Sequence, residues 1–136
     1  MSWDIFVQDL PTNAQSVRDI PDDFEPRPLG SRAEVVRRIH EVVPSANFSD
    51  PSWGTFNGPG FSVEFNVGDA DEVDAIALHV RGGDPAAGFV ADLLVRCGWR
   101  ALDTASESGF FDPANVVESI RRWRAYRDQV LNSESG

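Results

Sequence analysis

Residues 61–81 carry the strongest pattern in the chain, because two runs of alternating apolar and polar residues flank an acidic turn. Alternation with a period of two places the two sets of side chains on opposite faces of a β-strand. Residues 68–72, between the runs, have the composition of a turn. We therefore predict an antiparallel hairpin at the centre of one sheet. Its apolar face would carry Phe61, Val63, Phe65, Val67, Ile76, Leu78 and Val80.

The second face of this hairpin is polar and is the better candidate for a functional surface. A register slip of one residue would expose the apolar set of one strand, so the pattern fixes the register to within steps of two. In one allowed register Ser62 lies opposite His79, and in the next Glu64 does. The small Ala75 and Ala77 leave room on this face for a ligand or a covering loop. The candidate ligand or partner surface is Ser62, Glu64, Asn66, His79 and Arg81.

Further strands and helices are indicated on both sides of the hairpin. Trp3–Gln8 alternates and reads as a first strand. A capping box at Ser31 and Glu34 begins a helix that Pro44 ends. A short strand is expected at residues 53–56.

After the hairpin, Asp84 and Pro85 begin a second helix that closes at Gly98. Residues 99–104 form a last strand with Leu102 inward, and a final helix starts near residue 112. The order β-α-β-β-β-α-β-α predicts a single α+β domain, with one mainly antiparallel sheet of about four to five strands and about three helices.

Residues 9–30 form a long connection in which four prolines oppose regular helix. Six carboxylates against two arginines make residues 1–30 acidic. Ordered loops of this length are uncommon unless they are functional or bound to the body of the domain. Two interpretations stay open, a surface strap and a partner-binding segment.

The formal net charge of −10 restricts the classes of partner. Like charges repel, so the charge argues against binding to nucleic acid or to an anionic membrane surface. A basic protein is a compatible partner. All 12 basic residues are arginine, and those expected on the final helix, Arg121, Arg122, Arg124 and Arg127, form either an anion or docking patch or internal pairs with the acidic loop.

Other features favour a cytoplasmic protein without a cofactor. The single cysteine, Cys97, fits a reducing compartment and lies on the apolar face of its expected helix. No stretch approaches the length of a membrane span. No phosphate-binding loop, dinucleotide fingerprint or zinc motif is present, so we expect no metal and assign no catalytic residue. A contact between Glu64 and His79 would nevertheless hold an imidazole as a general base requires.

Three segments carry a resemblance to known proteins: WDIFVQDLP at the start, HVRGGDP in the middle and GWRALDTASESGFFDP near the end. With them the chain resembles an uncharacterised family of small bacterial cytosolic proteins, and the resemblance transfers no catalytic residue. The glycine–tryptophan strand that ends in aspartate is also similar to a feature of some immunity proteins of bacterial toxin systems.

Three hypotheses for function follow from the sequence. The first is a non-catalytic module that docks on a basic protein, of which toxin neutralisation is one form. The second is a small-molecule-binding protein or small enzyme that uses Glu64, His79 and Arg81. The third is a homo-oligomeric structural protein whose exposed aromatic residues form the interface.

Overall fold

A computed structural model describes residues 3–82, 85–106, 108–113, 125 and 129. Within them the fold is α+β, with a six-stranded antiparallel sheet, a two-stranded sheet and two helices. The six-stranded sheet has the order β3-β4-β5-β7-β1-β8, and β2 pairs with β6. The strands are β1 (Trp3–Gln8), β2 (Gly30–Ser31), β3 (Asn47–Asp50), β4 (Trp53–Gly58), β5 (Phe61–Asn66), β6 (Glu72–Val73), β7 (Ala75–Gly82) and β8 (Arg100–Asp103). The helices are α1 (Arg32–Val42) and α2 (Pro85–Cys97).

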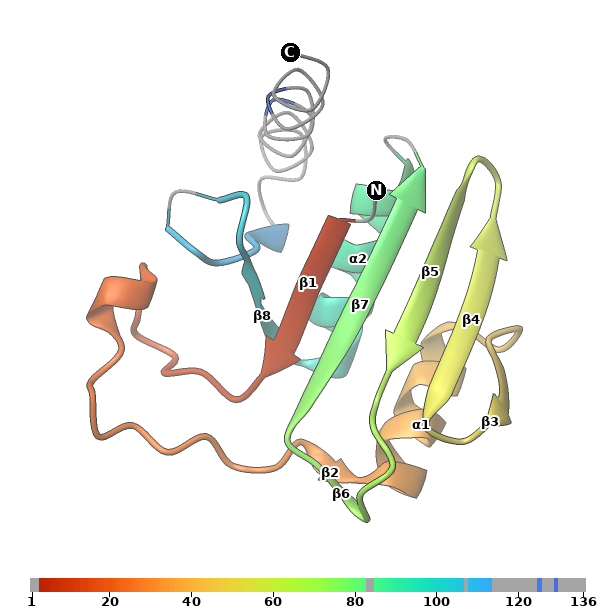
Figure 1. Cartoon of the computed structure of the whole chain (residues 1–136), viewed down its shortest axis with the longest axis horizontal. Helices are drawn as coiled ribbons and strands as arrows, with labels where there is room; N and C mark the ends of the chain where they lie inside the picture. Colours follow the sequence, from red (N-terminus) through yellow and green to blue (C-terminus); the bar gives the residue numbers. More distant parts are fainter. Residues whose placement is uncertain (1–2, 83–84, 107, 114–124, 126–128, 130–136) are drawn as a thin grey trace.

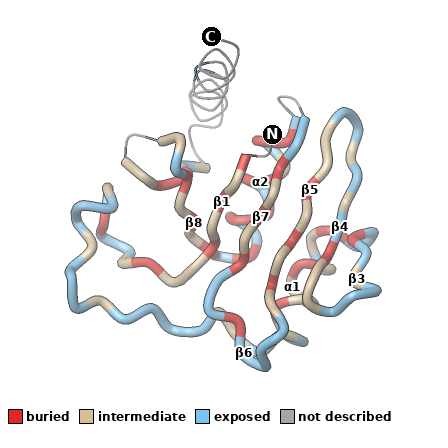
Figure 2. Tube along the Cα trace, viewed as in Figure 1, coloured by how far each residue is buried: buried red, intermediate tan, exposed pale blue. Residues whose placement is uncertain are grey.

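The predicted hairpin is present at the centre of this sheet. β5 and β7 pair antiparallel in the register that places Glu64 opposite His79. Phe65 and Leu78 face the core and are at most 1% exposed. Figure 2 shows the same alternation of buried and less buried positions along β1, β5 and β7.

Both described helices pack on one face of the sheet, behind it in Figure 1. Helix α1 begins as predicted, because the Ser31 hydroxyl accepts a hydrogen bond from the Glu34 amide at 3.2 Å. Helix α2 ends at Gly98, whose φ of +70° suits the left-handed position that glycine tolerates. We call this helix-covered side the core face of the sheet and the other side the outer face.

The main sheet has more strands than the four to five predicted. The sequence analysis missed β3 because its four residues lie in an aromatic and turn-rich stretch and include only one large apolar side chain, Phe48. The connection after β5 was expected to be a plain turn, yet part of it forms β6 and pairs with β2. The third predicted helix lies mostly outside the described residues.

The prediction that Leu102 faces inward is wrong. In β8 the buried residues are Ala101 and Asp103, and Leu102 lies on the outer face. Asp103 tolerates burial because its carboxylate accepts hydrogen bonds from the Trp3 indole and the Ala105 amide, both at 3.0 Å. Leu102 is partly shielded from solvent, because residues of the long 9–30 connection pack against it.

Candidate functional site

The structure brings the five predicted surface residues together on the outer face of β5 and β7. Ser62 lies opposite Arg81, Glu64 opposite His79, and Asn66 opposite Ala77. Each projects away from the core because it alternates with the buried residues of its strand, which include Val63 and Phe65 in β5 and Leu78 and Val80 in β7. Neither α1 nor α2 lies on this side of the sheet (Figure 1).

The contacts of His79 differ from the expected one with Glu64. The strand β1 lies on the other side of β7 and places Asp4 directly opposite His79. The His79 Nδ1 and Asp4 Oδ1 atoms are 2.8 Å apart. Glu64 instead forms an ion pair with Arg81. Arg81 lies diagonally across the β5–β7 pair from Glu64, and its side chain is longer than that of His79. The sequence offered no means of finding Asp4, because the position of β1 in the sheet order cannot be read from a strand pattern.

A tryptophan that the sequence analysis did not select completes this group. The Trp53 indole stacks on the His79 imidazole, with ring centroids 5.7 Å apart and an angle of 20° between the planes. Trp53 belongs to β4, which β5 separates from β7, so the indole extends across β5 to reach the imidazole. The small alanines of β7 leave space on this face, and part of that space is therefore available to the Trp53 ring.

The Asp4–His79 hydrogen bond and the Glu64–Arg81 ion pair orient side chains more than they stabilise the fold. The His79 and Asp4 side chains are 25% and 42% exposed, and Arg81 is half exposed. Exposed pairs of this kind contribute about 0.2–1 kcal/mol each. They do, however, hold the imidazole and guanidinium in place beside Trp53, so the face presents a preorganised group of side chains.

This arrangement has one element of a catalytic site. A carboxylate that orients an imidazole is the arrangement a general base uses. Among the described residues, however, no hydroxyl or thiol group hydrogen-bonds to His79, so no nucleophile is paired with it. Nor do any three described His, Cys, Asp or Glu side chains form a group that could hold a metal ion.

The long 9–30 connection covers one end of the outer face and leaves the rest open. Figure 1 shows it leaving β1, passing beside β8 and returning below the sheet to β2, without crossing β4, β5 or β7. Its covering part contributes to a small apolar cluster made of Leu10, Ala14, Ile20, Leu102 and Phe110. The surface-strap interpretation therefore applies to the first half of residues 9–30, which we call the strap.

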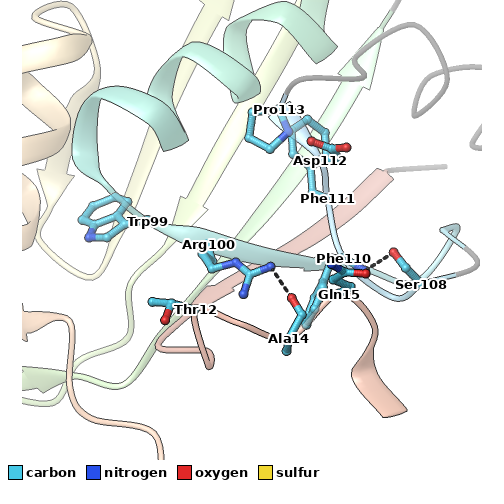
Figure 3. A pocket seen from close by; sticks show the side chains of 10 residues that line it. All are labelled: Thr12, Ala14, Gln15, Trp99, Arg100, Ser108, Phe110, Phe111, Asp112 and Pro113. Carbon is cyan, nitrogen blue, oxygen red and sulfur yellow. Dashed lines mark hydrogen bonds between the residues drawn. The ribbon is translucent and has the colours of Figure 1, made fainter. Parts of the chain in front are cut away.

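Arg100 fastens that strap and lines a cavity of about 420 Å³ (Figure 3). Its guanidinium donates to the carbonyl oxygens of Pro11 and Ala14, the latter at 3.0 Å, and lies 4.6 Å from the centre of the Phe110 ring. These contacts already use the charge of Arg100 within the protein. The cavity is therefore a weaker candidate for a functional site than the outer face.

Two other groups named from the sequence stand differently: one is buried, and the other is not described by the structure. Cys97 is buried, and burial raises the pKa of its thiol, which keeps it neutral and poorly nucleophilic. The predicted patch of Arg121, Arg122, Arg124 and Arg127 lies outside the described residues.

Comparison with protein-family models, with curated protein sequences and with solved structures finds no match for this chain. Within the described residues, no helix has the length and apolar character needed to cross a membrane. The case for a function therefore depends on the geometry of the outer face and on charge.

Proposed function

We propose that this chain is a cytoplasmic, non-catalytic protein-binding module that docks on a basic protein through the outer face of β4, β5 and β7. The observation that carries the proposal is the Trp53–His79 stack on a part of the sheet face that neither α1 nor α2 covers. Tryptophan and arginine are enriched among the residues that dominate binding energy at protein interfaces. Here Trp53, His79 and Arg81 are held close together by the sheet, by the His79–Asp4 hydrogen bond and by the Arg81–Glu64 ion pair.

The charge of the chain supports a basic partner over an acidic one. The formal net charge is −10, and the basic groups of the outer face, His79 and Arg81, each lie against a carboxylate. Long-range attraction would therefore speed encounter with a positively charged protein, while the outer face supplies the close contacts. An immunity-like role, in which a bacterial toxin is neutralised, is one form of this function.

A photo-crosslinking amino acid at Thr55 tests the proposal in the cells that make the protein. Thr55 is exposed on β4 and lies opposite Glu64 in the register. We expect a crosslink to one basic protein from Thr55. The matched control is the same group at Arg96, which is exposed on α2, on the other side of the sheet, and should give no such crosslink.

The proposal also predicts which substitution removes the crosslink. Trp53→Ala should reduce its yield about ten-fold or more, the loss typical of a central interface anchor. Val95→Ala changes an apolar residue that is 66% exposed on α2 and should leave the yield unchanged. Equal yields from Thr55 and Arg96 would contradict the proposal. A crosslink to a second copy of the chain would favour the homo-oligomer instead.

A further inference from the structure

A groove on the core side of the β3–β4 edge is separate from the outer face. It lies where the start of α1 meets the β3–β4 turn and the connection between β5 and β6. Its volume is about 590 Å³, within the range of sites that bind small ligands or side chains. The lining residues are Ser31, Arg32, Ala33, Val36, Phe48, Pro51 and Asp71.

Apolar side chains form most of the lining, and one of them is held firmly. The Phe48 ring packs against Phe65, with centroids 6.0 Å apart, and edge-on against His40 at 5.3 Å. Ala33, Val36 and Pro51 add further apolar surface. An apolar side chain that entered the groove would meet a preformed floor.

The polar side chains of Ser31 and Arg32 in the wall are already used by the fold. The Ser31 hydroxyl caps α1 by accepting from the Glu34 amide. Arg32 donates from its guanidinium to the Asp69 carbonyl oxygen and from its backbone amide to the Asp71 carbonyl oxygen, both at 2.9 Å. With these groups committed, apolar contact is the main interaction that the wall still offers.

One carboxylate lines this apolar groove, and two more belong to residues next to its lining residues. Asp71 lines the groove, and Asp50 precedes the lining residue Pro51. Hydrogen bonds from the Ser52 hydroxyl and amide, with a smaller contribution from the charge of Arg32, hold the pKa of Asp50 below its usual value. Glu72 lies opposite the lining residue Ser31. Of the described residues that line the groove, only Arg32 is basic, so the rim is acidic.

The neighbouring edge strand is poorly suited to pairing with an added strand. The Ser49 amide donates to the Asn47 side chain at 2.8 Å, and the Ser52 amide donates to the Asp50 side chain at 3.0 Å. The first of these local turns uses an amide of β3 that an incoming strand would need, and the second lies in the β3–β4 turn. A partner would therefore contact this corner through side chains.

We propose that the groove takes a large apolar side chain from a basic segment of a partner protein, with the flanking arginines or lysines over the acidic rim. Charge complementarity is the argument for this occupant, because an apolar floor with an acidic rim matches an apolar residue between cations. The proposal rests on the proposed function for the basic character of the partner, but it assigns a different surface.

Three hexapeptides test the groove directly by nuclear magnetic resonance titration of the whole chain at low salt. The probe alternates arginine and leucine; one control alternates glutamate and leucine, and the other alternates arginine and serine. We expect the arginine–leucine peptide to shift the amide signals of Val36, Phe48 and Asp71. Neither control should shift them comparably, because one lacks the charge and the other lacks the apolar group.

Two sets of variants separate the apolar floor from the acidic rim. Ala33→Phe, at an exposed position of α1, fills the groove and should weaken binding of the arginine–leucine peptide about ten-fold. Asp71→Asn with Glu72→Gln removes two rim carboxylates, keeps the Asp71 backbone acceptor of Arg32, and should weaken it about three-fold to ten-fold. The charge-matched control, Asp22→Asn with Asp23→Asn in the exposed second half of the 9–30 connection, should change the affinity less than about two-fold.

Several outcomes would overturn the proposal. These are signals that move only around Trp53, equal binding of the glutamate–leucine or arginine–serine peptide, and groove signals that depend on protein concentration without peptide, which would indicate a second copy of the chain. A missing crosslink at Thr55 would count against the proposed function and leave this titration standing. Failure of the titration alone would leave the outer face as the docking surface.

Discussion

At the scale of single residues, Gly54 and Gly88 show how the effect of the same substitution on stability depends on its surroundings. Gly54 is buried on the core side of β4, where an added Cβ would lie 2.3 Å from the Phe48 ring. That ring cannot easily move, because Phe65 and His40 hold it. Gly88 is exposed in α2, and an added Cβ there would meet no atom within 4 Å.

We predict opposite effects of alanine at these two glycines. Gly54→Ala should lower the free energy of unfolding by about 1–3 kcal/mol, because the added methyl group overpacks the core. Gly88→Ala should raise it by about 0.5–1 kcal/mol, because alanine loses less backbone freedom in a helix. Urea unfolding of both variants measures the two changes. A Gly54→Ala variant as stable as the parent would show that Phe48 is free to move.

At the scale of elements, the strap over the β8 end of the sheet is held by few contacts. Arg100 bonds two strap carbonyls, and the Val17 amide donates to the Ser108 carbonyl oxygen at 2.8 Å. The apolar cluster beneath it is small and separate from the main core. The strap should therefore open more readily than the strands that it covers.

Replacing Arg100 by methionine should loosen the strap while leaving the sheet intact. A hydrogen bond to a charged group contributes about 1.5–3 kcal/mol, so exchange of the Ala14 and Val17 amides should accelerate about ten-fold or more. Hydrogen exchange measures this, with the Leu78 amide as the internal reference. Arg96→Met removes only an exposed pair with Asp92 at 3.6 Å and should leave the strap unchanged. Uniform acceleration of amide exchange throughout the sheet would instead show that Arg100 contributes to the global free energy of unfolding.

At the scale of the whole molecule, the first strand joins the two ends of the described fold. β1 lies between β7 and β8, so the start of the chain must pair with strands formed far along the sequence. A buried hydrogen bond marks this junction, because the Trp3 indole nitrogen donates to the Asp103 carboxylate at 3.0 Å across 100 residues of sequence.

Trp3→Phe should therefore destabilise the entire domain. It removes a donor from a buried carboxylate, which costs about 1–3 kcal/mol. Trp53→Phe makes the same chemical change on the half-buried outer face and should alter the free energy of unfolding by less than about 1 kcal/mol. Thermal or urea unfolding distinguishes the two variants. Equal effects would show that the buried Trp3–Asp103 hydrogen bond contributes no more to stability than the half-buried Trp53 indole.

The sequence by itself determined the local structure and the faces of the central strands. The alternation in residues 61–81 was sufficient to predict β5, most of β7 and the five residues of the outer face. The Ser31 capping box and Gly98 marked ends of α1 and α2. These features could be predicted because strand alternation and helix capping depend on neighbours a few residues away.

Only the tertiary structure decided which of those residues meet. Local patterns allow several strand orders, so they could not show that β1 places Asp4 beside His79, or that Trp53 reaches across β5. They also could not show that a strap covers Leu102 while Asp103 is buried against Trp3. Such contacts depend on how distant segments pack. The sequence therefore placed five residues of the candidate site on one face, whereas only the fold supplied their partners Asp4 and Trp53.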